Sequence, residues 1–250
     1  MTSIELLTLK HGNMKDILNK VLNRGVSIIN HLKGLSGYYN LHYRQKKWTK
    51  VAIKMNLGNE VSWGEPTIEN EMLGDYIKIK DHLLLPNIKG KTVVELGCLD
   101  GKWSQHIVPY AGFTHLVDLS KTILPVLKKR LSNSGGGGGV GLYSFYETKG
   151  YELDGIRDNS IDFIFSIDTL VRVNKKYLRS YFNHFRRVLK SDGKMLIHLP
   201  CNVVPFSRQK GFVNLSPSEI VKMLHSNDFE EFGFDFSTIN HGVLIKYNFN

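Results

Sequence analysis

The sequence contains few cysteines and no long apolar segment. Its 250 residues include only Cys98 and Cys201, too few for a framework of structural disulfides. There is no run of 18 apolar residues, so no transmembrane helix is expected. The stretch from Met1 to Glu5 also lacks the charged and then apolar pattern of a secretory signal. These absences predict a protein without a membrane span in a reducing, cytoplasmic setting.

The sequence also lacks the usual phosphate-binding patterns. The glycine loop at residues 97–101 reads G-x-x-x-G, whereas a dinucleotide-binding fold requires G-x-G-x-x-G. A second glycine-rich segment, Gly135–Gly139, is not followed by the Lys-Ser/Thr pair of a P-loop. We interpret that segment as a flexible surface loop, because a run of glycines has no side chains to pack.

Acidic residues are outnumbered, and the excess of basic charge lies near the N-terminus. The net charge is +10, and residues 1–60 contain ten Lys and Arg against three Asp and Glu. Apolar residues recur there at helical spacing, which predicts a basic helical extension over residues 1–62 before a main domain over residues 63–250. Residues 42–54 interleave basic and aromatic side chains. A solvated helix face is the favoured interpretation of that segment, and a clamp for an anionic substrate is the alternative.

A strand, a glycine loop and a helix follow one another in residues 92–110. The β-branched run at 92–96 predicts a buried strand, and apolar residues recur at helical spacing after the loop. The next predicted strand, residues 114–117, is followed by Asp118. This order is the opening of a nucleotide-binding βαβ unit, in which an acid at this distance from the loop holds a ribose.

The acidic residues around the glycine loop bear on the choice of ligand. Two carboxylates, Glu95 and Asp100, would repel a pyrophosphate. They suit S-adenosylmethionine, which carries an ammonium and a sulfonium and no phosphate. The residues Glu95-x-Gly97-x-x-x-Gly101 resemble motif I of the class I S-adenosylmethionine-dependent methyltransferases, and Asp118 resembles the acid of their second motif.

The downstream sequence resembles the rest of that family's fold. Residues 158–170 are similar to the stretch that leads into the fourth strand, with Asp168 at its carboxyl end. The resemblance covers residues 63–250 and implies an α/β, Rossmann-like seven-stranded sheet, mostly parallel with an antiparallel last strand. The expected elements are helices at 68–85 (stopped by Pro86), 120–131, 178–189 and 217–226, strands at 140–145, 161–167, 194–199, 229–236 and 243–249, and a turn at 190–193.

The resemblance also implies which residues hold the cofactor. The family has an acid at the position of Lys149 in many relatives, where it reaches the adenine amino group. Here the adenine is expected to be held by backbone groups near Gly150 and Tyr151, or by Glu147 or Glu152. The implied cofactor-binding residues are Glu95, Gly97, Cys98, Asp100, Gly101, Asp118, Leu119, Gly150, Tyr151 and Ser166.

Two polar residues near the carboxyl ends of the predicted fourth and fifth strands are the candidate catalytic residues. His198 suits a general base because the unperturbed pKa of histidine lies near the operating pH. Asp168 is expected to position the nucleophile or the methionine end of the cofactor. Asp168, His198 and Asn202 could hold a metal ion, but their spacing does not require one, and no metal is predicted. Surface or structural roles are expected for His184, His225 and His241, and a packing role for Cys98.

The predicted function is methyl transfer to a hydroxyl or amine of a small molecule. Residues 165–171, with Ile197 and His198, resemble a bacterial branch linked to sugar and cell-surface glycan biosynthesis, which favours a sugar or related metabolite, including an anionic or nucleotide-linked one. One alternative is an RNA or protein methyltransferase that uses the basic N-terminus as a clamp. The N-P-P-Y motif of amino-directed nucleic-acid enzymes is absent from the matching site, residues 166–169, which counts against this alternative.

A non-catalytic scaffold subunit is the other alternative. It is suggested by Lys149 and Arg172, which replace residues that are usually an acid and a histidine in relatives. The oligomeric state is left open.

Overall fold

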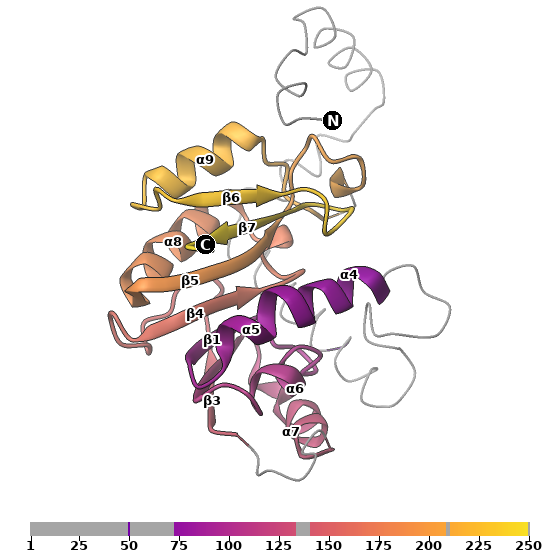
Figure 1. Cartoon of the computed structure of the whole chain (residues 1–250), viewed down its shortest axis with the longest axis vertical. Coiled ribbons are helices and arrows are strands. Elements are labelled where there is room, and N and C mark those ends of the chain that lie inside the picture. Colours follow the sequence, from indigo (N-terminus) through magenta and orange to yellow (C-terminus); the bar gives the residue numbers. More distant parts are fainter. Residues whose placement is uncertain (1–49, 51–72, 134–140, 209–210, 250) are drawn as a thin grey trace, which may run out of the picture. The chain divides into compact units, whose positions relative to one another are not determined.

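The computed structural model describes Lys50 and residues 73–133, 141–208 and 211–249 (Figure 1). Apart from Lys50, the predicted N-terminal extension lies outside the described residues. The same holds for the start of the predicted helix at residue 68 and for the glycine run at 135–139.

The described residues form a seven-stranded sheet with the strand order β3-β2-β1-β4-β5-β7-β6 (Figure 1). Strands β1 to β5 pair in parallel, and β7 pairs antiparallel with both of its neighbours. This arrangement confirms the predicted α/β fold with an antiparallel last strand. The strands are β1 (Thr92–Leu96), β2 (Phe113–Asp118), β3 (Tyr143–Glu147), β4 (Ile161–Ser166), β5 (Leu189–Leu199), β6 (Phe232–Asp235) and β7 (Val243–Tyr247).

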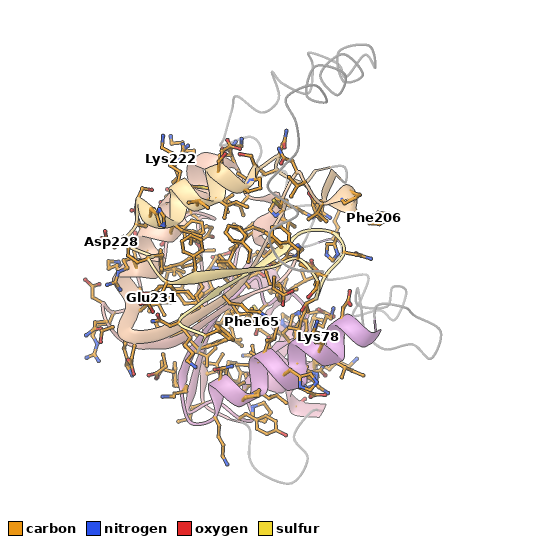
Figure 2. The ribbon with its side chains drawn as sticks, turned by 45° about the horizontal axis from the view of Figure 1, so that its top comes forward. Lys78, Phe165, Phe206, Lys222, Asp228 and Glu231 are labelled. Atoms are coloured by element: carbon orange, nitrogen blue, oxygen red, sulfur yellow. The ribbon has the colours of Figure 1, made fainter. Side chains whose placement is uncertain are left out.

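Helices cover both faces of the sheet, because the central strands are apolar on both sides. On one face, α8 (Lys175–Val188) and α9 (Pro217–His225) pack on side chains such as Ile164 and Ile197. The predicted capping box from Ser216 to Glu219 is present at the start of α9. The other face is covered by a leading helix and by α6 (Ser104–Ile107). Phe165 lies inside on that face, whereas Lys222 points away from α9 into solvent (Figure 2).

The leading helix continues past the residue at which it was expected to stop. It consists of α4 (Leu73–Ile77), the π-helical turn η2 (Lys78–Leu84) and α5 (Leu85–Ile88), which form one rod (Figure 1). Pro86 lies in the first turn of α5, where a missing backbone N–H is tolerated. The predicted stop at Pro86 is therefore wrong, and the helix ends at Ile88, two residues before Gly90 with φ of 68°.

Several predicted boundaries also require correction. Strand β3 starts at Tyr143, later than expected, and the predicted helix at 120–131 is a short 3-10 turn, η3 (Lys121–Ile123), followed by α7 (Leu124–Asn133). The predicted turn at 190–193 lies within β5. Its residues form an irregularity, since Leu189 pairs with Ile161 and Lys194 already pairs with Phe163. The extra residues on β5 are accommodated as a bulge without ending the strand.

Candidate cofactor and acceptor site

The glycine loop after β1 has the backbone conformation that its sequence predicts. Gly97 and Gly101 have φ angles of 85° and 89°, a region that residues with a Cβ rarely adopt. The Gly97 amide donates a hydrogen bond to the Val117 carbonyl at 2.7 Å, which holds the loop against β2. A Cβ on Gly97 would collide with the side chain of Thr169. Glycine is thus required at this position for both its conformation and its size.

Asp118 links the end of β2 to the glycine loop. Its Oδ2 accepts a hydrogen bond from the Leu99 amide at 3.0 Å, and its Oδ1 accepts one from the Leu119 amide at 2.7 Å. Burial raises the pKa of Asp118 to about 6, against the lowering effect of these hydrogen bonds. The carboxylate is therefore mostly ionised at neutral pH, and its orientation is fixed by two backbone donors. A fixed carboxylate with remaining lone pairs can accept hydrogen bonds from two ribose hydroxyls.

The two other acids near the loop carry less charge than the sequence suggests. Ser104 donates a hydrogen bond to Glu95 at 2.6 Å, and burial raises the pKa of Glu95 to about 8. Asp100 is buried and forms an ion pair with Arg130 at 2.9 Å. Glu95 is mostly protonated at pH 7 and Asp100 is balanced by a cation, so the negative charge available to a ligand comes mainly from Asp118.

The predicted adenine-binding segment follows β3. Gly150 has a φ of 88°, and its amide donates to Thr148 Oγ1 at 3.1 Å. The Tyr151 ring stacks on Tyr177 at 5.3 Å between centroids. Glu152 accepts hydrogen bonds from Tyr146 Oη at 2.7 Å and from the backbone amides of Lys149 and Asp154 at 2.8 and 3.1 Å. Its carboxylate is occupied in holding this loop, which leaves the backbone as the better candidate for contact with adenine.

Two further cofactor-binding candidates have buried side chains. Ser166 is fully buried and its hydroxyl donates to the Leu96 carbonyl at 3.0 Å, which ties β4 to β1. Cys98 is buried within an apolar cluster that includes Leu116 and Leu127, as expected for a packing residue. These two buried side chains shape the loop. At both positions, the backbone is the part of the residue that could contact a ligand.

A second group of polar side chains lies just beyond the end of β4. Asp168 has a φ of 60°, a left-handed conformation that is uncommon for a residue other than glycine. Its Oδ1 atom lies 2.9 Å from His198 Nδ1 and 2.9 Å from His241 Nε2. The two imidazole rings are 4.7 Å apart and nearly perpendicular. We call Asp168, His198 and His241 the Asp-His cluster.

The three members of the Asp-His cluster differ in exposure and charge. The side chain of Asp168 is 39% exposed, that of His241 10% and that of His198 0%. Burial alone would raise the pKa of Asp168, but the hydrogen bonds from both histidines outweigh it and hold that pKa well below its usual range. Burial lowers the pKa of His198 more than Asp168 raises it, so His198 is neutral. Asp168 is thus an ionised group with one accessible edge.

The surroundings of His198 bear on its predicted role. Its Nε2 atom is buried, faces Gly242 and has no hydrogen-bond partner among the described residues. The enclosed ring contacts Asp168 through Nδ1, and the role of general base stays a prediction.

His241 is the residue that sequence reasoning missed. It was expected to have a surface or structural role, yet its side chain lies close to those of Asp168 and His198. In the sequence analysis, Asn202 was considered as the third metal ligand beside these two residues. The loop before β7 brings His241 to Asp168 because β7 lies beside β5 in the sheet. Its position follows from this long-range pairing, and the local sequence around His241 contains no motif that predicts it.

Residues from two further elements surround the Asp-His cluster. Asp75 of α4 lies near enough to His241 for their attraction to lower the Asp75 pKa, although burial raises it more. The Arg172 guanidinium lies over the Phe212 ring at 4.8 Å, and that ring is 6.2 Å from His241. By contrast, His184 pairs loosely with Asp154 and His225 packs near Phe232, so neither belongs to the site.

Residues 94–197 match the family described as Methyltransferase domain (Methyltransf_11). Among curated protein sequences, none matches this chain. No helix of the described residues is long and apolar enough to cross a membrane.

Solved structures with this fold share little sequence with the chain. The DhpI–SAH complex is 15% identical, with a TM-score of 0.60 over 82% of this chain and 95% of that one. Magnesium protoporphyrin IX methyltransferase from Synechocystis PCC 6803, with bound SAM, is 12% identical, with a TM-score of 0.59 over 83% and 96%. Phosphoethanolamine N-methyltransferase 1 from Haemonchus contortus is 15% identical, with a TM-score of 0.57 over 86% of this chain and 50% of that one. The matching domain and the sheet topology together show that residues 94–197 belong to an S-adenosylmethionine-dependent methyltransferase domain with the class I fold.

Proposed function

We propose that this methyltransferase methylates a hydroxyl or amine of a small molecule, and that the acceptor binds against Asp168. The observation that carries the proposal is the carboxylate of Asp168, ionised and 39% exposed just beyond β4. Ligands of open α/β sheets bind at the carboxyl ends of the strands. A sugar or a related metabolite is the acceptor class we favour, from the resemblance of residues 165–171.

The cofactor half of the proposed site is built from the glycine loop and Asp118. The Asp118 carboxylate is held by the Leu99 and Leu119 amides and would accept the two ribose hydroxyls. The backbone at Gly97 and Gly101 allows close approach of the methionine part, and the backbone near Gly150 would contact adenine. Bound in this way, S-adenosylmethionine would lie at the same edge of the sheet as Asp168.

The acceptor half has to orient a nucleophile. In methyl transfer, a lone pair of the acceptor attacks the methyl carbon, the bond from that carbon to sulfur breaks, and S-adenosylhomocysteine leaves. Asp168 would accept a hydrogen bond from the acceptor O–H or N–H and so direct the lone pair at the methyl group. Because its pKa is low, Asp168 positions the acceptor and is a weak base.

The comparisons agree with a small acceptor without identifying it. Two of the structural neighbours are named for small molecules, phosphoethanolamine and magnesium protoporphyrin IX. The alternative of an RNA or protein acceptor depends on the basic extension at residues 1–62, most of which lies outside the described residues. The free, buried thiols of Cys98 and Cys201 are in keeping with the cytoplasmic setting that we propose.

The test combines cofactor binding with turnover. Calorimetry with S-adenosylhomocysteine and release of that product from S-adenosylmethionine, over a panel of sugars, amines and hydroxy acids, would be measured for wild type and Asp168→Asn. We expect the variant to bind S-adenosylhomocysteine within about threefold of wild type and to lose about 100-fold in turnover. Asp192→Asn, an exposed change in the β5 bulge, is the matched control. Product release with RNA or protein alone would contradict the proposed acceptor class.

A further inference from the structure

We propose that the Asp-His cluster binds a divalent transition-metal ion, with Asp168 Oδ1, His198 Nδ1 and His241 Nε2 as its ligands. The ligand atoms of the three side chains lie within 4.8 Å of one another. Within residues 73–133, 141–208 and 211–249, this is the one group of three such side chains with this proximity. The role of the ion toward an acceptor rests on the proposed function, whereas binding of the ion does not.

The distances within the cluster suit a metal ion. Each imidazole nitrogen lies 2.9 Å from Asp168 Oδ1. Adjacent ligands of an octahedral ion with bonds of about 2.1 Å are about 3 Å apart. The two nitrogen–oxygen separations therefore match those of adjacent ligands, and movements of the imidazole rings, whose ligand nitrogens lie within 4.8 Å of each other, would bring both nitrogens onto one ion.

The position of His241 also suits a metal ligand. Its Nε2 lies 2.9 Å from Asp168 Oδ1, and its Nδ1 lies 3.1 Å from Asn240 Oδ1. With an ion on Nε2, Nδ1–H would donate a hydrogen bond to Asn240. Metal-bound histidines usually make such a second hydrogen bond.

His198 provides a rigid second nitrogen. Its ring is fully buried and packs against Gly242, where a Cβ would collide with Nε2. Its Nδ1 lies 2.9 Å from Asp168 Oδ1, so coordination by Nδ1 would replace the hydrogen bond between these two atoms with a bond from each of them to the ion. The ring would then carry its proton on Nε2, which has no hydrogen-bond partner among the described residues.

The ligand set indicates both the metal and the acceptor. Two imidazoles and one carboxylate favour zinc, manganese, iron or cobalt over magnesium or calcium. Three protein ligands leave open positions on the exposed side of Asp168, which an acceptor with two adjacent oxygens, such as a vicinal diol or a hydroxy acid, can occupy. The ion would lower the pKa of a bound hydroxyl, so that its proton passes to water before the oxygen attacks the methyl carbon.

The first measurement is metal binding to the chelator-treated full chain. Calorimetry with Zn²⁺ and Mn²⁺, and metal content after dialysis, would be compared for wild type, His241→Ala and His225→Ala. We expect the change at His241 to weaken binding at least tenfold. The change at His225, an exposed residue at the end of α9, should have no effect. Equal metal binding by wild type and His241→Ala would overturn the proposal.

A second readout does not depend on the folding of a variant. Cobalt(II) added to the wild type should give visible absorption bands typical of mixed nitrogen and oxygen coordination, and zinc should remove them. Absence of these bands, with no calorimetric binding, overturns the metal site. S-adenosylhomocysteine titrations on the same samples separate the two proposals, because cofactor binding without metal binding contradicts only this one.

Discussion

The side chain of Thr169 fills the space next to Gly97 that a Cβ would need, although the two residues are far apart in sequence. The contact joins the glycine loop after β1 to the segment that follows β4. The same short segment contains Asp168. The loop proposed to hold the cofactor therefore contacts the segment that contains the residue proposed to hold the acceptor.

Gly97→Ala should destabilise the fold and weaken S-adenosylhomocysteine binding. A left-handed φ of 85° costs a residue with a Cβ about 1–2 kcal/mol, and the collision with Thr169 adds to this. Urea unfolding measures the loss. In the double variant with Thr169→Ala, the destabilisation should be smaller than the sum of the two single changes. Simple additivity would show that the contact with Thr169 is not what excludes alanine.

Asp118→Ala should reduce the affinity for S-adenosylhomocysteine by about 10- to 100-fold, because hydrogen bonds to a charged group contribute about 1.5–3 kcal/mol each. Calorimetry at pH 7.5 measures the change. Asp192→Ala, an exposed acid on the β5 bulge, should bind as wild type does.

The affinity of the wild type for S-adenosylhomocysteine should also fall as the pH is lowered through about 6, where Asp118 becomes protonated. A pH-independent affinity between 5 and 8 would contradict the ribose role.

Glu95→Gln should make the protein more stable than wild type at pH 8. Burial raises the pKa of Glu95 in the folded state from 4.5 to about 8, so the folded state binds more protons than the unfolded state in that window. The stability of wild type therefore falls as the pH rises from 4.5 to 8, and glutamine, which does not ionise, removes that part of the loss.

Urea unfolding at pH 5 and pH 8 checks this expectation for Glu95. The variant should gain at pH 8 and differ little at pH 5. Glu231→Gln, an exposed change (Figure 2), should leave the difference between the two pH values as it is in wild type. A variant with the full pH dependence of wild type would show that Glu95 ionises normally in the fold.

Gly242→Ala should damage the acceptor half of the site and spare the cofactor half. The added Cβ would collide with His198 Nε2 and lie 2.5 Å from the Leu199 carbonyl oxygen, so the His198 ring must leave its present position beside Asp168. We expect at least a tenfold loss of turnover with an unchanged affinity for S-adenosylhomocysteine, measured on one preparation. Gly233→Ala, where a Cβ meets nothing within 4 Å, is the matched control.

The parts of the fold that depend on local sequence were predicted well. Strand β1 has the predicted bounds, and Asp118 is fixed to the glycine loop by hydrogen bonds from Leu99 and Leu119. The charge state of Glu95 was not foreseen, because it depends on burial by residues distant in sequence. The bulge in β5 was expected to be a turn, since Ser191, Asp192 and Gly193 favour turns when their pairing with another strand is unknown. His241 was missed because only the antiparallel return of β7 brings it to Asp168.

The two halves of the site differ in how much of the chain must be in place before each can exist. Asp118 and Leu99 are 19 residues apart, whereas Asp168 and His241 are 73 residues apart, with β5 and α9 between them. Contacts that close longer loops cost more chain entropy and tend to form later in folding. We therefore expect a folding chain to position Asp118, the acid proposed to bind the ribose, before the cluster proposed to hold the acceptor. Methyl transfer would then begin only when the C-terminal strands have docked, so a partly folded chain could hold cofactor without using it.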